Sequence, residues 1–214
     1  MKKLLLLLSV CAFISCTSEN KNVEIQSTEI DSANTEVVME DLAEDIYLAY
    51  NPEKTDLKWT AYKTPEKVGV QGSFDSIVVN NTNESEIPEE VLEGATFNIT
   101  TSSMTTGDAS RDAKILSLFF NNLEDKNIIG SFGKFENGVV PIKITMNNIE
   151  ATKNFQYTFE NRKVVITGVI DVITDFKANR GFSLLEEACA ALHLNKSWTD
   201  VSIEIISDLE KPKA

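Results

Sequence analysis

Residues 136–160 read ENGVVPIKITMNNIEATKNFQYTFE and carry the clearest indication of the fold class. The stretch opens with a tight turn at Glu136-Asn137-Gly138, because an Asn-Gly pair tolerates the positive φ that such turns need. Apolar residues then recur at every second position, from Val140 to Met146 and again from Phe155 to Phe159. A period of two is typical of β-strands with one buried face. The stretch therefore predicts two strands of a sheet that faces a core on one side.

The same alternation extends over most of the chain after Leu57. It predicts further strands near residues 57–62, 68–75, 95–100, 164–173 and 201–205, with a less regular candidate at 126–136. About eight strands joined mostly by short turns favour an all-β antiparallel sheet, because parallel strands would need helical crossovers. Eight strands with apolar inner faces close most simply into a barrel, which also removes exposed edges. We therefore predict an eight-stranded antiparallel barrel with one or two short helices, and a two-sheet sandwich is the alternative.

Two segments break the strand pattern and predict the helices. Residues 108–122 gather their apolar side chains as on a short helix with one apolar side. Ser183 and Glu186 have the spacing of a capping box, which marks a helix start. The residues that follow at helical spacing on one face are Leu185, Ala188, Cys189 and Leu192. We expect this second helix to pack on the barrel wall or to cover one of its ends.

The composition excludes several classes of function. The chain has 214 residues, with 20 Lys and Arg against 33 Asp and Glu, and a net charge of −13. Such a charge argues against nucleic acid as a partner, because phosphate binding needs a basic face. The single histidine leaves no multi-histidine metal site. A hydrophobic content of 42% is enough for a core, so the chain is not disordered throughout.

The first residues predict that the protein is exported to the bacterial cell envelope. Lys2 and Lys3 precede an apolar run over residues 4–14, which is too short to span a membrane and fits a secretion signal. The run ends at Ser15 and Cys16, in a pattern that resembles the bacterial lipobox. We therefore expect residues 1–15 to be a cleaved signal peptide and Cys16 to carry lipid, anchoring the protein in the outer membrane on its periplasmic side. An ordinary signal peptide with a chance cysteine is the alternative.

The composition of the segment that follows Cys16 is typical of a spacer and not of a packed helix or strand. Residues 17–45 are rich in Ser, Thr, Asn and acidic residues, and such a segment cannot bury enough surface to offset its ordering entropy. We therefore expect residues 16–45 to form the lipidated cysteine and a flexible acidic tether, residues 46–209 the barrel domain, and residues 210–214 a tail. After cleavage and lipidation only Cys189 would keep a thiol, so no intrachain disulfide is expected.

The sequence offers weak candidates for catalysis or metal binding. Glu186, Cys189 and His193 have helical spacing, so a metal site or a Cys-His nucleophile is conceivable, but zinc needs three or four ligands and no second cluster is visible. Packing of Cys189 in the apolar stripe is the simpler interpretation. Arg111 and Asp112 are interpreted as residues that fix a loop. We therefore predict no enzyme, no metal and no cofactor.

Apolar residues on the expected inner faces are the candidates for ligand binding. Most such residues simply form a core, but a wide barrel with few polar groups inside would leave an apolar slot suited to a hydrocarbon chain. The candidate lining residues are Trp59, Val70, Phe74, Phe97, Ile99, Ile142, Ile144, Phe155, Tyr157, Phe159, Ile166 and Ile170.

Several motifs of the chain resemble the YceI-like family. They are Gly72-Ser73-Phe74, the run from Thr101 to Gly107 that leads into Arg111-Asp112, and the late segments 188–193 and 196–201, which are similar to a lipoprotein branch of that family. The resemblance covers about residues 49–207. It implies a lipocalin-like, eight-stranded barrel that binds a polyisoprenoid or another long-chain amphiphile in its lumen, without catalytic activity.

Together these observations predict an envelope lipoprotein that binds or carries an isoprenoid-like lipid. The expected partners are therefore an apolar lipid and, through the acyl anchor, the membrane. A structural or partner-binding lipoprotein, with a barrel filled by its own side chains, is the alternative. The sequence leaves open the head group of the ligand and whether two barrels associate as a dimer.

Overall fold

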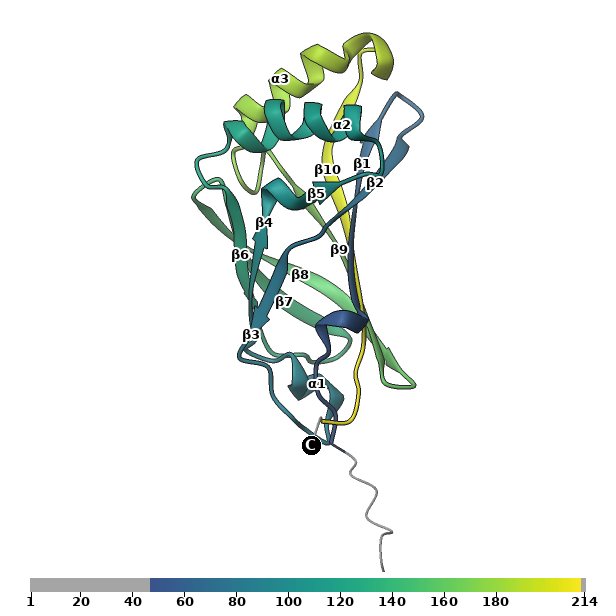
Figure 1. Cartoon of the computed structure of the whole chain (residues 1–214), viewed down its shortest axis with the longest axis vertical. Helices are drawn as coiled ribbons and strands as arrows, with labels where there is room; N and C mark the ends of the chain where they lie inside the picture. Colours follow the sequence, from purple (N-terminus) through teal and green to yellow (C-terminus); the bar gives the residue numbers. More distant parts are fainter. Residues whose placement is uncertain (1–46, 213–214) are drawn as a thin grey trace, which may run out of the picture. The chain divides into compact units, whose positions relative to one another are not determined.

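The computed structural model describes residues 47–212 (Figure 1). The expected signal peptide, Cys16 and the acidic tether lie outside these residues. Ten antiparallel strands form one sheet, in the spatial order β3-β4-β6-β7-β8-β9-β10-β1-β2-β5. Their bounds are β1 (Thr55–Lys63), β2 (Val68–Phe74), β3 (Ile77–Asn80), β4 (Thr96–Thr100), β5 (Met104–Thr105), β6 (Asn127–Phe132), β7 (Val139–Met146), β8 (Ile149–Glu160), β9 (Lys163–Asp171) and β10 (Ser197–Asp208).

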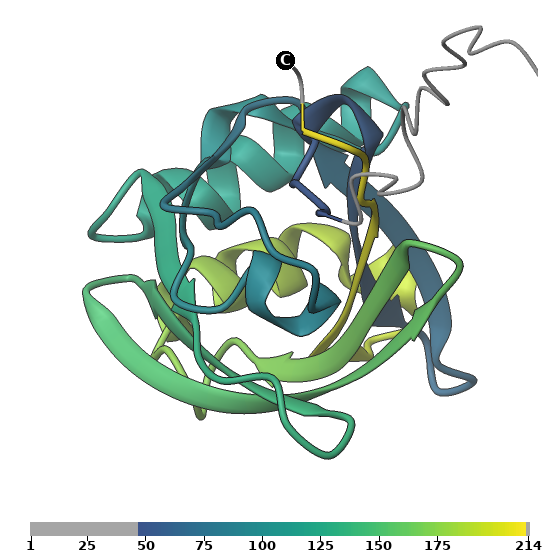
Figure 2. The ribbon, with the colours of Figure 1, turned by 90° about the horizontal axis from the view of Figure 1, so that it is seen from below.

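Two bent strands bring the edges of this sheet together. β2 and β3 follow each other with only Asp75 and Ser76 between them, and they pair with β5 and β4. A 3-10 turn at Thr101–Ser103 interrupts the second bent strand in the same way. At the bend, the backbone N–H of Asp75 donates to the Ser103 carbonyl oxygen at 3.0 Å. The sheet therefore curls into a barrel, which Figure 2 shows from one end, and its ten segments correspond to the eight strands predicted.

Helices lie at both ends of the barrel (Figures 1 and 2). One end carries α1 (Pro88–Val91), and the chain enters there, since Leu48 pairs with Ser85 and Ala49 with Glu210. The other end carries α2 (Ala109–Lys114), which continues through a π turn to Phe119 and a 3-10 turn to Asn122, as predicted for residues 108–122. It also carries α3 (Asn179–Cys189), which leads into a 3-10 turn at Ala190–His193. No helix within residues 47–212 has the length and apolar character needed to cross a membrane.

The predicted start of α3 at Ser183 is wrong. The helix begins at Asn179, four residues earlier, and Ala178 makes no side-chain cap, so Ser183 and Glu186 do not form a capping box. The preceding turn fixes the start, because Asp171 accepts hydrogen bonds from the backbone N–H groups of Ile173 and Thr174 at 2.9 and 2.8 Å. Tertiary packing supports the early start, since an ideal Cβ on Gly181 would lie 2.8 Å from the Phe119 carbonyl oxygen.

The apolar face of α3 also differs from the prediction. Cys189 is buried and Leu185 is half-buried, but Ala188 is exposed and Leu192 has 66% of its surface exposed. The α-helix ends at Cys189 and continues as a 3-10 turn, which has three residues per turn. The α-helical periodicity that would place Leu192 on the same face as Cys189 therefore no longer applies. Of the four residues of the predicted stripe, only Leu185 and Cys189 are therefore withdrawn from solvent.

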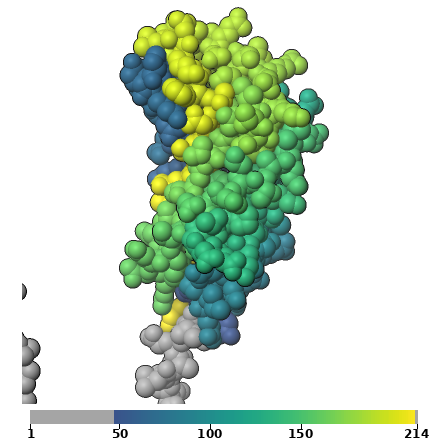
Figure 3. Space-filling model, turned by 180° about the vertical axis from the view of Figure 1, so that it is seen from behind, coloured from purple at the N-terminus to yellow at the C-terminus, as the bar shows by residue number. Residues whose placement is uncertain are grey.

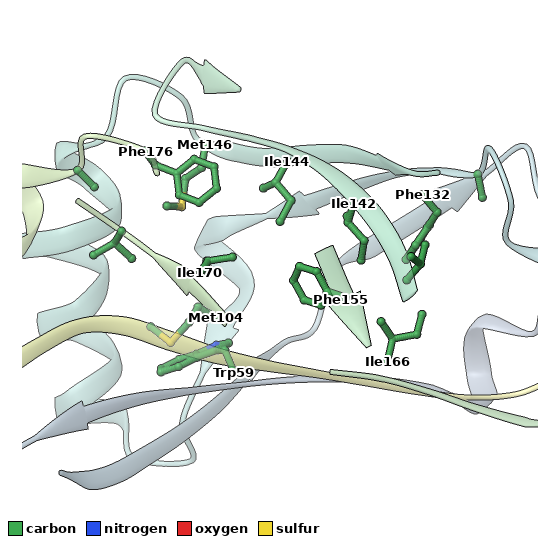
Figure 4. Packing of buried hydrophobic residues seen from close by; sticks show 14 of the residues in the cluster. Trp59, Met104, Phe132, Ile142, Ile144, Met146, Phe155, Ile166, Ile170 and Phe176 are labelled. Atoms are coloured by element: carbon green, nitrogen blue, oxygen red, sulfur yellow. The ribbon is translucent and has the colours of Figure 1, made fainter. Parts of the chain in front are cut away.

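The core lies inside the barrel. Apolar side chains from facing strands point toward one another there (Figure 4). Phe155 and Ile166 are almost fully buried, on β8 and β9 respectively. Gly168 leaves room for this packing, because a Cβ at that position would overlap the Phe155 ring. The period-two pattern of β8 is confirmed, with Phe155, Tyr157 and Phe159 turned inward and their neighbours exposed.

Candidate functional site

An apolar cavity of about 100 Å³ occupies the half of the barrel nearest α1. Phe97 and Ile99 of β4, and Ile142 and Ile144 of β7, line it together with Phe155 of β8. The rings of Phe97 and Phe132 meet edge to face with their centroids 5.7 Å apart, which fixes one wall. No charged side chain lines this half of the barrel.

A second apolar cavity, of about 170 Å³, lies under the helices at the other end. The helical segment 109–122 contributes Phe119 and Phe120 to its wall, and α3 contributes Phe182 and Leu185. The residues that line both cavities are Phe74, Ile128, Met146, Ile170 and Ile203. Because the two cavities share these walls, they adjoin each other along the barrel, and we call the pair the inner cavity.

Each half of the inner cavity is large enough for several water-sized groups, because about 10–15 Å³ of free space is enough to hold one. Since the lining is almost entirely apolar, the groups that it suits are those of a hydrocarbon chain.

The polar residues at the end nearest α1 bond to one another. We call this group, made of Tyr50, Thr55 and Ser207, the far end. The Thr55 hydroxyl donates to the Asn51 carbonyl oxygen at 2.9 Å, so the Ser207 hydroxyl donates to Thr55 Oγ1, at 2.7 Å. Burial raises the pKa of the Tyr50 phenol, and a hydrogen bond to Thr55 partly offsets that rise. The far end therefore holds no charge and no free hydroxyl of Ser207 or Thr55.

The opposite end opens into a more polar space of about 300 Å³ between α2, α3 and the hairpin of β1 and β2, which we call the vestibule. Figure 3 shows this hairpin, in blue, beside the start of β10, in yellow. The pairing of Lys63 with Ser197 joins the two segments. The vestibule shares Trp59, Ile115 and His193 with the inner cavity, so the two spaces adjoin each other.

Positive charges outnumber negative ones in the vestibule. Lys63 lies at the end of β1, and Arg111 and Lys114 lie on α2. Asp108 contributes the single carboxylate of the lining and is 3.6 Å from the Arg111 guanidinium. Asp108 also caps α2, since its Oδ1 accepts from the backbone N–H groups of Ser110 and Arg111 at 3.0 and 3.1 Å.

The pKa of His193, the single histidine of the chain, is affected by this environment. Burial and then the neighbouring Lys63 charge lower the pKa of His193, and the Glu186 carboxylate opposes them. Nδ1 of the imidazole lies 2.9 Å from the Ser197 hydroxyl. The ring is therefore held beside the vestibule with its neutral form favoured.

The interpretation of Arg111 and Asp112 as loop-fixing residues holds for Asp112. Its carboxylate accepts from the backbone N–H and the hydroxyl of Thr106, at 2.8 and 2.6 Å, and from the Thr105 hydroxyl at 3.2 Å. The Thr106 hydroxyl bond lowers the pKa of Asp112 most, partly offset by desolvation, and the other hydrogen bonds and Arg111 lower it further. Arg111 itself lines the vestibule.

Most of the sequence-predicted lining residues lie together around the inner cavity. Those that line it are Trp59, Phe74, Phe97, Ile99, Ile142, Ile144, Phe155 and Ile170. Val70 lines the vestibule, opposite Ala61 in the β1–β2 pair. Tyr157 and Phe159 face inward but pack beside Phe135 in a separate space of about 10 Å³, and Ile166 is fully buried in the core. These last three residues therefore do not line the inner cavity.

Sequence reasoning found Phe74 and Ile170, but it missed the other residues that line both halves of the inner cavity, and it missed the two lysines of the vestibule. The other residues are Ile128, Met146 and Ile203. Ile128 was ambiguous because Ile129 is apolar too, and only the structure shows that Ile128 faces the cavity while Ile129 is exposed. Lys63 and Lys114 carry no local signal, because lysines on strands and helices are common. Their shared position depends on how α2 packs over the end of β1.

The cluster of Glu186, Cys189 and His193 does not form a metal site. Cys189 is buried with 7% of its surface exposed, and both it and His193 line the vestibule. Within residues 47–212, no three His, Cys, Asp or Glu side chains are arranged to hold a metal ion. Packing remains the simplest role for Cys189.

The barrel has the fold of solved YceI proteins. It matches Burkholderia cenocepacia BcnA with a TM-score of 0.54 at 13% identity, over 75% of this chain and 99% of that one. It matches a polyisoprenoid binding domain from Saccharophagus degradans, implicated in plant cell wall breakdown, with a TM-score of 0.55 at 13% identity, over 78% and 99%. A Campylobacter jejuni YceI protein matches with a TM-score of 0.50 at 14% identity, over 69% and 87%.

Sequence comparison alone finds no matching protein-family model and no matching curated protein. At identities of 13–14%, the similarity is one of fold. The barrel architecture expected from the YceI-like resemblance is thus confirmed.

Proposed function

We propose that the protein binds the apolar chain of an isoprenoid-like or other long-chain lipid in the inner cavity and sequesters or carries it without catalysing a reaction. The observation that supports this most strongly is the pair of adjoining apolar cavities inside the barrel. A barrel filled by its own side chains, which is the structural alternative, would leave no such space. The binding of a polyisoprenoid by the Saccharophagus degradans domain of the same fold supports the same class of ligand.

The proposal places the protein in the bacterial envelope, held at the outer membrane by lipid on Cys16. The support is the basic start, the short apolar run and the small residue before Cys16 in the sequence. Cys16→Ser should release the protein from the membrane fraction into the soluble periplasmic fraction. Membrane retention of this variant would contradict anchoring through Cys16.

Replacing Phe97 by Asp tests the lumen assignment. The substitution puts a carboxylate on the wall of the inner cavity, where it would lack a charge partner. We expect the full chain with Cys16→Ser to load geranylgeraniol, a C20 isoprenoid alcohol, and the additional Phe97→Asp change to abolish that loading, as measured by native mass spectrometry. Asn98→Asp is the matched control, because Asn98 is the exposed neighbour on β4.

Circular dichroism would establish that the Phe97→Asp variant is folded. Loading that survives in a folded Phe97→Asp protein would contradict the assignment of the inner cavity as the binding site. Failure of the unsubstituted cavity to load any long-chain lipid would favour the partner-binding alternative instead.

A further inference from the structure

We propose that the vestibule binds an anionic head group, a phosphate or a carboxylate, on the lipid whose chain occupies the inner cavity. This inference rests on the proposed function, since it assigns the polar end of the same ligand. It adds a second binding region, formed by Lys63, Arg111 and Lys114, and a chemical class for the group that this region recognises.

The vestibule and the inner cavity have part of their walls in common. The residues that line both are Trp59, Ile115, Leu185 and His193. An amphiphile with its chain in the inner cavity would therefore have its polar end close to the vestibule side chains. The head group would lie between the end of β1 and α2.

Within the part of the chain that the structure describes, the cations of the vestibule are largely without carboxylate partners. Among residues 47–212, neither Lys63 nor Lys114 has a carboxylate oxygen within 4.0 Å, and Arg111 has Asp108 alone, at 3.6 Å. Asp108 already accepts two backbone hydrogen bonds as the cap of α2. The chain as a whole has a net charge of −13, so a space lined by three cations and one carboxylate is a local reversal of sign. Such a space favours an anion.

The electrostatics of the neighbouring histidine agree with this charge balance. The charge of Lys63 contributes to the lowered pKa of His193, after burial, although Glu186 on α3 acts in the opposite direction. Glu186 lines the inner cavity beneath the helices and does not line the vestibule. The positive field is therefore strongest on the side of β1 and α2.

Among the described residues, an unpaired hydrogen-bond donor lies where the vestibule and the inner cavity adjoin. The indole N–H of Trp59 is buried and has no acceptor within the described part of the chain. Its ring packs over Gly72, where a Cβ would overlap it, so the ring position is fixed by close contact. A buried donor without a partner costs free energy, and an oxygen atom of a head group or of its ester link could supply the acceptor.

The far end offers no competing position for a charged head group. Thr55 and Ser207 bond to each other, and Ser207 is fully buried. A charge placed there would find no counter-ion among the residues that line that half of the cavity. The ligand would therefore lie with the end of its chain toward α1 and its head group toward α2 and α3.

The test compares probes that share a tail. Geranylgeranyl phosphate and geranylgeraniol have the same C20 chain and differ in head-group charge, and hexadecanoate supplies a carboxylate. Binding is measured by titration to the full chain with Cys16→Ser, and to the same chain with Lys63→Gln and Lys114→Gln. Lys134→Gln with Lys163→Gln is the matched control, because both lysines are exposed on hairpins outside the vestibule.

We expect geranylgeranyl phosphate to bind about tenfold more tightly than geranylgeraniol, and the double vestibule variant to remove about that factor. The affinity for geranylgeraniol should change much less than the affinity for the phosphate in the double vestibule variant, and circular dichroism would establish that all variants are folded. Tight binding of hexadecanoate as well as the phosphate would define the head group as any anion, whereas binding of one alone would define which anion is recognised.

Equal affinity for geranylgeranyl phosphate and geranylgeraniol would overturn the inference while leaving the proposed function intact. A preference for the phosphate that survives in the double vestibule variant would overturn the assignment to Lys63 and Lys114. If none of the three probes binds, the proposed function fails and the inference fails with it.

Discussion

The polar side chains at the two ends of the barrel differ in whether they have partners within the protein. At the far end, Thr55 and Ser207 bond to each other, and no charged group lines the cavity. At the vestibule, Lys63 and Lys114 have no carboxylate partner among the residues described, although water reaches them. Unpaired charge is tolerated where solvent is near, but it is too costly in the interior. The difference gives the cavity a direction, with one end suited to a chain terminus and the other to a polar group.

A chain that lies in this direction needs a passage between the two halves of the inner cavity, and blocking that passage should have the largest effect. Ile170 lines both halves of the inner cavity, so Ile170→Trp should fill the passage and weaken binding of geranylgeraniol more than about 100-fold, at a stability cost of about 1–3 kcal/mol. Val169→Trp is the control, since the adjacent Val169 is 51% exposed on the outer face. Isothermal titration checks both variants, and unimpaired binding by folded Ile170→Trp would contradict a continuous passage.

Disrupting the far end should lower stability without changing head-group preference. Ser207→Ala removes the donor to Thr55 Oγ1 from a fully buried position, and we expect a loss of about 1–2 kcal/mol in the free energy of unfolding. Urea denaturation measures this loss. The ratio of affinities for geranylgeranyl phosphate and geranylgeraniol should stay the same. A changed ratio would place the head group at the far end and reverse the direction of the ligand.

Added salt should weaken the binding of a charged head group in the vestibule and should not weaken the binding of an apolar chain. Raising the ionic strength from about 0.01 M to about 1 M shortens the screening length from about 30 Å to about 3 Å. The affinity for geranylgeranyl phosphate should therefore fall a few-fold across this range, while the affinity for geranylgeraniol should not fall. An anion preference that does not change with salt would argue against recognition by exposed cations.

The smallest expected effect is on the titration of His193. Burial and the charge of Lys63 lower the pKa of this histidine below 6.5, so the unfolded chain binds the proton more readily. The resulting contribution to stability is complete above about pH 6.5 and is lost as the pH falls through the folded-state pKa. Lys63→Gln should raise the pKa of His193, and Lys134→Gln should not. Because the chain has one histidine, its NMR titration is unambiguous, and an unmoved pKa would contradict the charge account of the vestibule.

The strand pattern made the barrel predictable, because alternation on β7 and β8 reports directly which face is buried. The count of strands differed only because Asp75–Ser76 and Thr101–Ser103 interrupt two of them. The start of α3 was not predictable, since the turn at Asp171 and the contact of Gly181 with Phe119 override the local capping signal at Ser183. Neither of these two interactions can be predicted from the local sequence.

The residues of the candidate site were likewise predictable from the sequence only in part. Inner-face residues such as Phe97 and Ile142 followed from alternation, and the structure places both on the cavity wall. Alternation gives the face of a residue but not its height in the barrel, which is why Tyr157 and Phe159 lie beyond the cavity although they face inward. The vestibule depends on the crossing of α2, α3 and β1, so Lys63 and Lys114 could not be grouped from the sequence.

The most direct test of the account is native mass spectrometry of the full protein purified from an envelope extract without detergent. We predict a mass above that of the lipidated chain, and release by organic extraction of a species with a long apolar chain. The same measurement on Ile170→Trp should give the chain mass without this addition. A bare chain mass for the unsubstituted protein, repeated after incubation with long-chain isoprenoids and fatty acids, would contradict lipid binding in the inner cavity.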